Sequence, residues 1–376
     1  MVWSRRWARM IWERTRAQLL RGELGRLPVV VGLALIWGYF QTQNNNFLTA
    51  RNLSNLIMQI GVLGTLAVGI VLVLLLGEID LSIAAVSGVC AGIFGLLLTN
   101  HGWNAWAAIA LTLAVGALIG LIQGAWVVYV GVPSFIVTLA GLLAWQGVLL
   151  ALLGNEGELL ITNATVRSIA SSYFSPLWGW LLGVGALAVY LALLWSRWVS
   201  RRRHSLEPPS VPMLVVRSAI ATLIAVVVVA TLNSYFGVPY VLAILLALTA
   251  FFALMLNKTA FGRHVYAIGG NAEAARRAGI HVGRVRVAIF TIASTLGAFG
   301  GILGASREFA VSTGTGGGTL LLDAIAAAVI GGTSLFGGRG FISSALLGAL
   351  VIGSVENGLD LLGQSSSTKD VATGII

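Results

Sequence analysis

The sequence predicts an all-α polytopic membrane protein, and its composition and apolar runs support this fold class. Of the 376 residues, 57% are hydrophobic and only 10% are charged, whereas a soluble globular domain carries about 25% charged residues. The apolar runs continue for about 20 residues, the length that an α-helix needs to cross a lipid bilayer. A membrane β-barrel is excluded, because its strands alternate apolar and polar residues over roughly 10 positions.

Apolar segments, taken in order along the chain, predict about twelve transmembrane helices. Eleven of them lie at 27–43, 54–76, 81–99, 105–130, 133–153, 176–195, 214–234, 238–257, 285–305, 319–336 and 341–362. A further segment begins near residue 370. Because Asp370 to Ile376 is too short to cross a bilayer, we expect this last span to be truncated or to form a stub.

Positive charge gathers on one side of the predicted spans. Residues 1–26 hold seven Arg, residues 196–217 hold five Arg, residues 258–286 hold six basic residues, and Arg339 adds one, which gives 19 of the 23 Lys and Arg. Cytoplasmic loops carry an excess of Lys and Arg, so we expect this side and the N-terminus in the cytoplasm. The net charge of +10 forms no soluble basic face, and no nucleic-acid partner is predicted.

The hydrophobic blocks and the polar breaks divide the chain into six segments. Residues 1–26, with Trp3, Trp7 and Trp12 among arginines, predict an amphipathic helix on the cytoplasmic membrane face. The other segments are a first transmembrane block at 27–195, a basic cytoplasmic linker at 196–213, a transmembrane helix pair at 214–257, a cytoplasmic loop at 258–285 and a C-terminal transmembrane block at 286–376.

The 258–285 loop is polar but is patterned like a folded element. Asn271 is a good helix N-cap, Glu273 stands where the helix dipole favours an acid, and Gly279 can end the helix. Between them lie strong helix formers and two basic residues: Ala272, Ala274, Ala275, Ala278, Arg276 and Arg277. The pattern predicts a two-turn helix whose alanine face admits another protein and whose arginines meet its acidic groups. An ordinary capped loop helix explains the pattern equally well.

A set of motifs in the same order along most of the chain resembles the ribose/xylose-type sugar permeases of ABC importers. The matching stretches are ARNLSNLI (50–57), EIDLS (78–82), VPSFIVTLAG (132–141), GVPY (237–240), AFGRHVYAIGGNAEAARRAGI (260–280), LDAIAAAVIGGTSLFGG (322–338) and ENGLDLLG (356–363). The extra hydrophobic pair with its basic linker at 196–213 is similar to the xylose branch of this family.

The resemblance implies a type II permease fold and a homodimer in the bacterial inner membrane. It further implies an ATP-binding subunit on the cytoplasmic side and a periplasmic or extracellular sugar-binding protein that delivers D-xylose or a similar pentose. The ATPase would dock on the short helix of the 258–285 loop. The residues expected to couple to it are Asn271, Glu273, Ala274, Ala275, Arg276, Arg277 and Gly279.

The sequence predicts no ATP hydrolysis by this chain. A P-loop requires Gly-x-x-x-x-Gly-Lys-Ser/Thr, whose backbone amides and Lys hold the phosphates. Neither Lys258 nor Lys369 follows such a glycine loop. We therefore expect a non-enzymatic subunit without a cofactor of its own, with ATP and Mg²⁺ bound by the partner ATPase. The single Cys and four scattered His also predict no metal site.

Polar residues within or beside the predicted spans are candidates for the translocation path, because polar groups at membrane depth are costly unless they function. These candidates are Gln59, Glu78, Asp80, Gln123, Asp323, Glu356 and Asn357. For Asp80 and Asp323, capping of the following helix is the favoured interpretation, and Glu78 is expected at the membrane interface. For Glu356 and Asn357, capping and interhelical hydrogen bonds explain the residues as well as transport does.

Two other function classes stay open at the level of sequence. An ion-coupled secondary transporter would use acids such as Glu78 and Asp80 and would need no ATPase. A membrane-embedded transferase would need clustered Asp or His to hold a metal ion or a phosphate, and the sequence has no such cluster. The transferase is therefore the least favoured of the three.

Overall fold

The computed structural model describes residues 27–154, 156–205 and 210–375. The predicted amphipathic segment at 1–26 lies outside these residues. The described helices are α2 (Leu27–Gln43), α3 (Ala50–Leu75), α4 (Ile83–Thr99), α5 (Ala105–Ala125) with a π-helical turn η1 (Trp126–Val130), α6 (Ser134–Leu153), α7 (Ala164–Ser171), α8 (Pro176–Arg203), α9 (Val211–Asn233), α10 (Tyr240–Lys258), α11 (Ala260–Gly270), α12 (Ala272–Arg277), α13 (Val282–Glu308), α14 (Leu320–Ile330), α15 (Ile342–Leu361) and α16 (Ser366–Ile375).

The chain is an all-α polytopic membrane protein, as predicted. Eight described helices are long and apolar enough to cross a membrane, and three shorter apolar helices, α2, α4 and α14, accompany them. Together they match the eleven complete apolar segments of the sequence one for one. The twelfth segment is α16, which is not among the apolar helices in the described part of the chain.

The structure differs from the sequence prediction most clearly at α8, α14 and α11. Helix α8 continues to Arg203 instead of ending at 195, because the helix propensity of its arginines carries it past the apolar stretch. Helix α14 ends at Ile330 instead of 336, since Gly331 and Gly332 follow and Gly332 has a φ of +105°. Helix α11 was not predicted. Gly269 and Gly270 are its last two residues, and the helix ends there with Asn271 as the C-cap.

Helix α3 forms the centre of the bundle. In its most apolar stretch 78% of the residues are buried, whereas the figure for α8 is 6%. The side chains of α3 pack with those of α13, α14 and α15 in one core. Helix α5 approaches α13 closely because Gly116, Gly120 and Gly124 face it. A methyl group on Gly116 would lie 2.9 Å from the Ser294 carbonyl oxygen, so small residues are required here.

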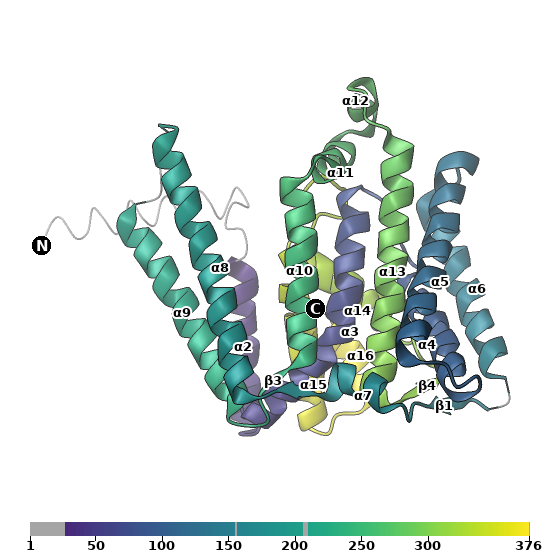
Figure 1. Cartoon of the computed structure of the whole chain (residues 1–376), viewed down its shortest axis with the longest axis horizontal. Coiled ribbons are helices and arrows are strands. Elements are labelled where there is room, and N and C mark those ends of the chain that lie inside the picture. Colours follow the sequence, from purple (N-terminus) through teal and green to yellow (C-terminus); the bar gives the residue numbers. More distant parts are fainter. Residues whose placement is uncertain (1–26, 155, 206–209, 376) are drawn as a thin grey trace, which may run out of the picture.

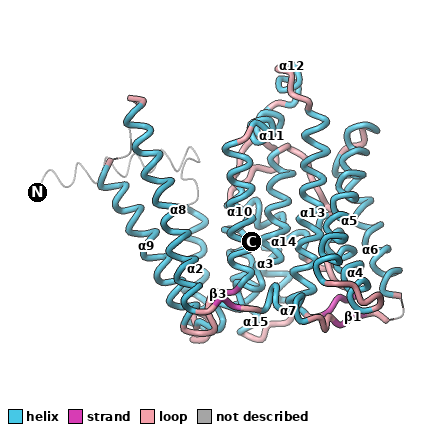
Figure 2. The backbone as a smooth tube through the Cα atoms, in the orientation of Figure 1, coloured by secondary structure: helices cyan, strands magenta, loops and turns pink. Residues whose placement is uncertain are grey.

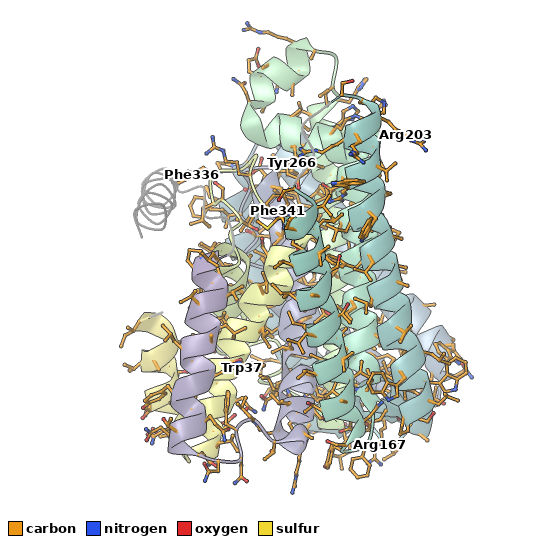
Figure 3. The ribbon with its side chains drawn as sticks, turned by 90° about the vertical axis from the view of Figure 1, so that its left-hand side faces the viewer. Trp37, Arg167, Arg203, Tyr266, Phe336 and Phe341 are labelled. Carbon is orange, nitrogen blue, oxygen red and sulfur yellow. The ribbon has the colours of Figure 1, made fainter. Side chains whose placement is uncertain are left out.

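The bundle has two distinct ends (Figure 1). Helices α11 and α12 stand at one end, which we call the α12 end. Helix α7 and two short antiparallel pairs, β1 (Glu158–Leu160) with β4 (Ala310–Ser312) and β2 (Tyr173–Phe174) with β3 (Val238–Pro239), lie at the other, the α7 end (Figure 2). In the side view Arg203 is near the α12 end and Arg167 at the α7 end (Figure 3).

Candidate functional site: an exposed helix at one end and a polar cavity near the other

The α12 helix has the caps that its sequence predicts. Asn271 Oδ1 accepts a hydrogen bond from the Ala274 amide at 2.9 Å, which satisfies one of the free donors at the helix start. Gly279 follows the helix with a φ of +84°, a conformation that costs glycine little. The preceding helix α11 begins in the same way, with Thr259 Oγ1 accepting from the Gly262 amide at 3.2 Å. The two helices are therefore locally specified.

The charged side chains of α12 form a small ion-pair cluster. Glu273 contacts Arg276 at 3.0 Å and Arg277 at 3.1 Å, and the three side chains are 55%, 66% and 80% exposed. The predicted arginines thus pair with an acid of their own helix. Exposed ion pairs of this kind contribute about 0.3–0.5 kcal/mol. Because so little is lost when they open, both arginines remain available to acidic groups of a partner.

One predicted contact residue requires a correction. Ala275 is only 4% exposed and belongs to the main hydrophobic core of the bundle. In this structure Ala275 therefore cannot contact a partner directly. Its small side chain instead packs α12 against the bundle, while the neighbouring Ala274 is exposed. The alanine face of α12 consequently divides into a core side and an outer side.

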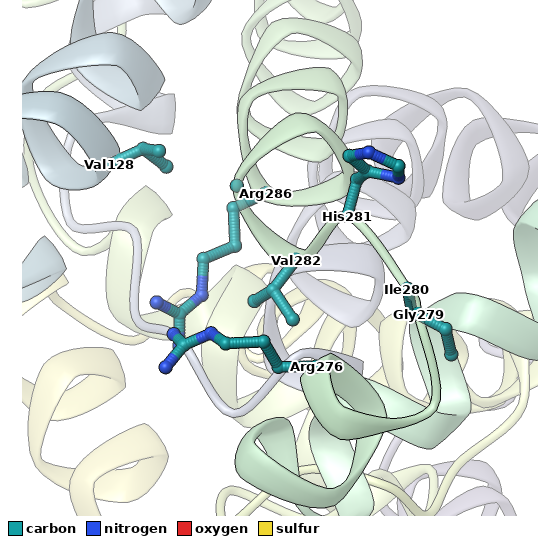
Figure 4. Close-up of a pocket in the computed structure, with 8 residues that line it drawn as sticks. Val128, Arg276, Gly279, Ile280, His281, Val282 and Arg286 are labelled. Atoms are coloured by element: carbon teal, nitrogen blue, oxygen red, sulfur yellow. The ribbon is translucent and has the colours of Figure 1, made fainter.

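A cavity of about 540 Å³ lies between α12 and the start of α13. The side chains of Arg276 and Arg286 extend into it close to each other (Figure 4). Glu78 forms an ion pair with Arg286 at 2.8 Å, and the two side chains are 13% and 28% exposed. Glu78 is thus placed at the α12 end. It pairs with a cation there. The sequence favoured a position at the membrane interface for Glu78, with a place beside the translocation path as the alternative.

Glycine residues allow close backbone contact between three segments: the end of α11, the end of α3 and the 331–341 loop. The Gly338 amide donates to the Leu75 carbonyl oxygen at 3.0 Å, and Tyr266 Oη donates to the Gly340 carbonyl oxygen at 3.0 Å. A methyl group on Gly269 would overlap the same Leu75 oxygen. This glycine junction, made of Gly77, Gly269, Gly270, Gly337 and Gly338, joins α11 to the end of α3 and to the 331–341 loop after α14.

A polar cavity of about 460 Å³ lies between α3, α4, α13, α14 and α15, toward the α7 end. It brings together three of the predicted path residues, Gln59, Asp323 and Glu356. Its other lining residues with side-chain polar or charged groups are Ser87, Arg307, Glu308, Ser312, Thr315 and Asp360. Asp323 is 3% exposed and its Oδ1 atom has no hydrogen-bond partner among the described residues.

A relay of side-chain amides orients Gln59 at the edge of this cavity. Asn52 Nδ2 donates to Asn357 Oδ1 at 2.7 Å, and Asn357 Nδ2 donates to Gln59 Oε1 at 3.1 Å. Asn357 thus makes interhelical hydrogen bonds, one of the interpretations that the sequence left open beside capping and transport. On the same helix, Asp360 is ion-paired with Lys369 of α16.

Asp80 and Gln123 form a separate buried network. Asp80 Oδ1 accepts from the Ser82 amide at 2.8 Å and from Ser82 Oγ at 2.7 Å. Ser82 Oγ also lies 3.1 Å from Gln123 Oε1, so its single proton is shared between the Asp80 and Gln123 oxygens. This arrangement orders the chain immediately before α4, whose N-cap residue is Ser82 and not Asp80. Neither Asp80 nor Gln123 lines the polar cavity.

Comparison with known proteins places the chain among permeases. Residues 52–376 match the family described as branched-chain amino acid transport system / permease component. The chain is 38% identical to the xylose transport system permease protein XylH of Escherichia coli (strain K12) over 344 residues, 92% of this chain and 87% of that protein. It is 33% identical to the ribose import permease protein RbsC of Bacillus subtilis (strain 168), over 94% of this chain and 91% of that protein.

The chain belongs to the ribose/xylose-type ABC permeases. The xylose permease of Haemophilus influenzae is also similar, at 37% identity over 89% of each chain. No solved structure gives a significant match. The resemblance inferred from the ordered motifs is therefore confirmed at the level of the family.

The sequence did not point to several residues that build these sites in the permease. Arg307 lines the polar cavity, and the only signal for it was a charged Arg-Glu pair at the end of an apolar run. Asn52, Arg286 and Tyr266 act through contacts with residues far away in sequence. A local pattern cannot indicate such contacts.

Proposed function

We propose that this permease is the membrane-spanning subunit of an ABC importer that carries a monosaccharide, D-xylose or a similar pentose, into the cytoplasm. A separate ATPase would supply the energy. The proposal of a pentose is supported by the similarity to permeases named for xylose and ribose transport. It also fits a polar cavity lined by amide, hydroxyl and carboxylate groups, which are hydrogen-bonding partners of sugar hydroxyls.

The observation that carries the proposal is the position and construction of α12. This helix is capped at both ends, seated on the core through Ala275 and otherwise exposed at the end opposite to α7. The α12 end also holds Arg201, Arg202 and Arg203 in the last turn of α8. By the positive-inside rule this end faces the cytoplasm. The N-terminus is then cytoplasmic, and the protein would lie in the inner membrane of a bacterium.

Three protein partners follow from this arrangement. A second copy of the permease would complete a homodimer, and an ATP-binding subunit, which holds ATP and Mg²⁺, would dock on each α12. Acidic side chains of the ATPase would meet Arg276 and Arg277 and enter the cavity beside Arg286. A periplasmic or extracellular sugar-binding protein would deliver substrate to the α7 end, toward which the polar cavity lies.

The glycine junction supplies a mechanical route from α12 to the cavity. Movement of α12 is transferred to α11, which abuts the ends of α3 and the 331–341 loop without intervening side chains. Helix α14, which carries Asp323, ends where that loop begins. Closure of the ATPases would therefore shift α3 and α14 together and change access to the cavity.

The experiment that tests the proposal is copurification with the ATPase, followed by ATP hydrolysis measured in liposomes. The importer assignment predicts a stable complex and hydrolysis that rises when sugar-loaded binding protein is added. A permease that binds no ATPase, or a complex whose hydrolysis ignores the loaded binding protein for every pentose and hexose tried, would contradict the proposal.

A further inference from the structure

The geometry points to a direct binding site for one uncharged monosaccharide in the polar cavity, centred on Asp323, Glu356 and Gln59. The permease would then bind and select the sugar directly, in addition to any selection by a binding protein. This inference rests on the proposed function, because it names where the transported solute is held. It goes further because it names the residues that bind the sugar and predicts that negatively charged sugars are excluded.

The first argument is the unsatisfied carboxylate of Asp323. Its carboxyl group interacts with the side chains of Thr319 and Glu356, but Oδ1 has no hydrogen-bond partner among the described residues. A buried oxygen atom without a hydrogen-bond partner costs free energy, and Asp323 is only 3% exposed. A ligand that donates a hydrogen bond from a hydroxyl group would remove that cost while it is bound.

The second argument is the fixed amide of Gln59. The relay from Asn52 through Asn357 occupies the Gln59 Oε1 atom, so the Nε2 group is left to donate to a ligand. Within the described residues Gln59 Nε2 makes no hydrogen bond, and Gln59 lines the cavity. The cavity therefore offers a donor beside acceptors. A hydroxyl group both donates and accepts, which matches this mixture better than a cation or an anion does.

The third argument is the balance of charge and apolar surface. Of the described residues that line the cavity, four are acids, Glu308, Asp323, Glu356 and Asp360, and one is a cation, Arg307. Asp360 is also ion-paired with Lys369 outside the lining, so the acids exceed the cations by two. This excess of acids disfavours sugar phosphates and sugar acids by repulsion. Apolar side chains of Val62, Leu63 and Leu320 complete the lining and offer surface to the C–H face of a sugar ring. The volume of about 460 Å³ is within the range of small-ligand sites.

A metal ion is the competing occupant of an acidic cavity. No group of three or more His, Cys, Asp or Glu in the described ranges is arranged to hold one. The acids of the cavity come from α13, α14 and α15 and are spread along its lining. Spread acceptors suit several hydroxyl groups on one ring better than a single ion, which needs its oxygen ligands at about 2.0–2.6 Å.

The test measures binding of radiolabelled D-xylose to the full-length permease in nanodiscs, without ATPase or binding protein, by equilibrium dialysis. We expect saturable binding, competed by unlabelled D-xylose or D-ribose but not by D-xylonate. Asp323→Asn and Glu356→Gln should each weaken binding about tenfold, because each loses a charged hydrogen bond. Glu158→Gln is the matched control, since Glu158 is exposed at the same end and lies outside the cavity. It should bind as the wild type does.

Gln59→Leu gives an independent variant in case a carboxylate variant does not fold, and elution as a single peak in gel filtration checks each protein. Equal binding by wild type, Asp323→Asn and Gln59→Leu would overturn the inference, as would equal competition by D-xylonate. Uptake by the complete complex separates this result from the proposed function. If the complex imports D-xylose and Asp323→Asn leaves the half-saturating concentration unchanged, the binding site is wrong and the importer assignment stands.

Discussion

Tyr266 Oη donates a hydrogen bond to the Gly340 carbonyl oxygen at 3.0 Å, and so ties α11 to the loop between α14 and α15. Burial raises the pKa of Tyr266. The phenol therefore stays protonated and keeps donating at any pH near neutrality. This bond and the bond from the Gly338 amide to the Leu75 oxygen fix the same loop to two different helices. The α12 end is thus one connected unit.

Gly269→Ala should disrupt this unit, whereas Gly270→Ala should not. A methyl group on Gly269 would overlap the Leu75 carbonyl oxygen and approach the Gly338 amide, while a methyl group on Gly270 has no atom within 4 Å. Backbone atoms cannot move aside cheaply, so we expect the first variant to lose ATP-driven uptake and several degrees of thermal stability. Uptake and melting of the two variants, compared side by side, check this. Equal behaviour would mean that the junction does not transmit movement.

Asn271→Ala should weaken α12 selectively. The variant loses the bond from the Ala274 amide, and loss of such a cap costs about 1 kcal/mol. We expect lower affinity for the ATPase with normal membrane insertion, measured as the amount of ATPase retained on the immobilised permease. Asn271→Ser keeps a capping oxygen and should restore most of the affinity. If the Ser variant is as defective as the Ala variant, the side chain does something other than capping.

Glu273→Gln separates stability from coupling. Its two ion pairs are exposed, so the loss of both should change the free energy of unfolding by no more than about 1 kcal/mol. We nevertheless expect sugar uptake to fall relative to ATP hydrolysis, because the variant frees Arg276 and Arg277 from their fixed geometry. The ratio of sugar imported to ATP hydrolysed is the readout. An unchanged ratio would argue against a coupling role for Glu273.

Glu78→Gln should destabilise the protein more than the double variant Glu78→Gln/Arg286→Met. The single variant leaves the guanidinium of Arg286, 28% exposed, without its counterion, which we expect to cost about 1–3 kcal/mol. The double variant also removes the unpaired positive charge of Arg286 and therefore avoids this cost. Thermal unfolding in detergent measures both. If the single variant is no less stable than the wild type, this ion pair contributes nothing to the α12 end.

The transmembrane segments and the capped helix α12 were predictable because their signals are local. Twenty apolar residues in a row determine a span wherever they occur, and the Asn271 cap and Gly279 stop depend only on nearby residues. Gly116, Gly120 and Gly124 also carried a usable signal, since a glycine every fourth residue marks one close-packed helix face. The end of α14 at Ile330, earlier than the predicted 336, was harder to predict, because Gly331 follows an uninterrupted apolar run.

The sites that depend on tertiary contacts were only partly predictable. Gln59, Asp323 and Glu356 were each selected as polar residues in apolar surroundings, but their meeting in one cavity depends on how α3, α14 and α15 pack. The same limitation explains Glu78, whose partner Arg286 is distant in sequence. The burial of Ala275 depends on how α12 leans against the core. A two-turn helix gives no periodicity long enough to reveal its buried side.

The central claim is that ATP hydrolysis by a separate ATPase drives transport through this permease. Uptake of radiolabelled D-xylose into proteoliposomes tests this claim most directly. We predict no accumulation by the permease alone, with or without a proton gradient. Accumulation should begin when the ATPase, the sugar-binding protein and ATP are all supplied. Accumulation by the permease alone, abolished by a protonophore, would contradict the account and would identify an ion-coupled transporter.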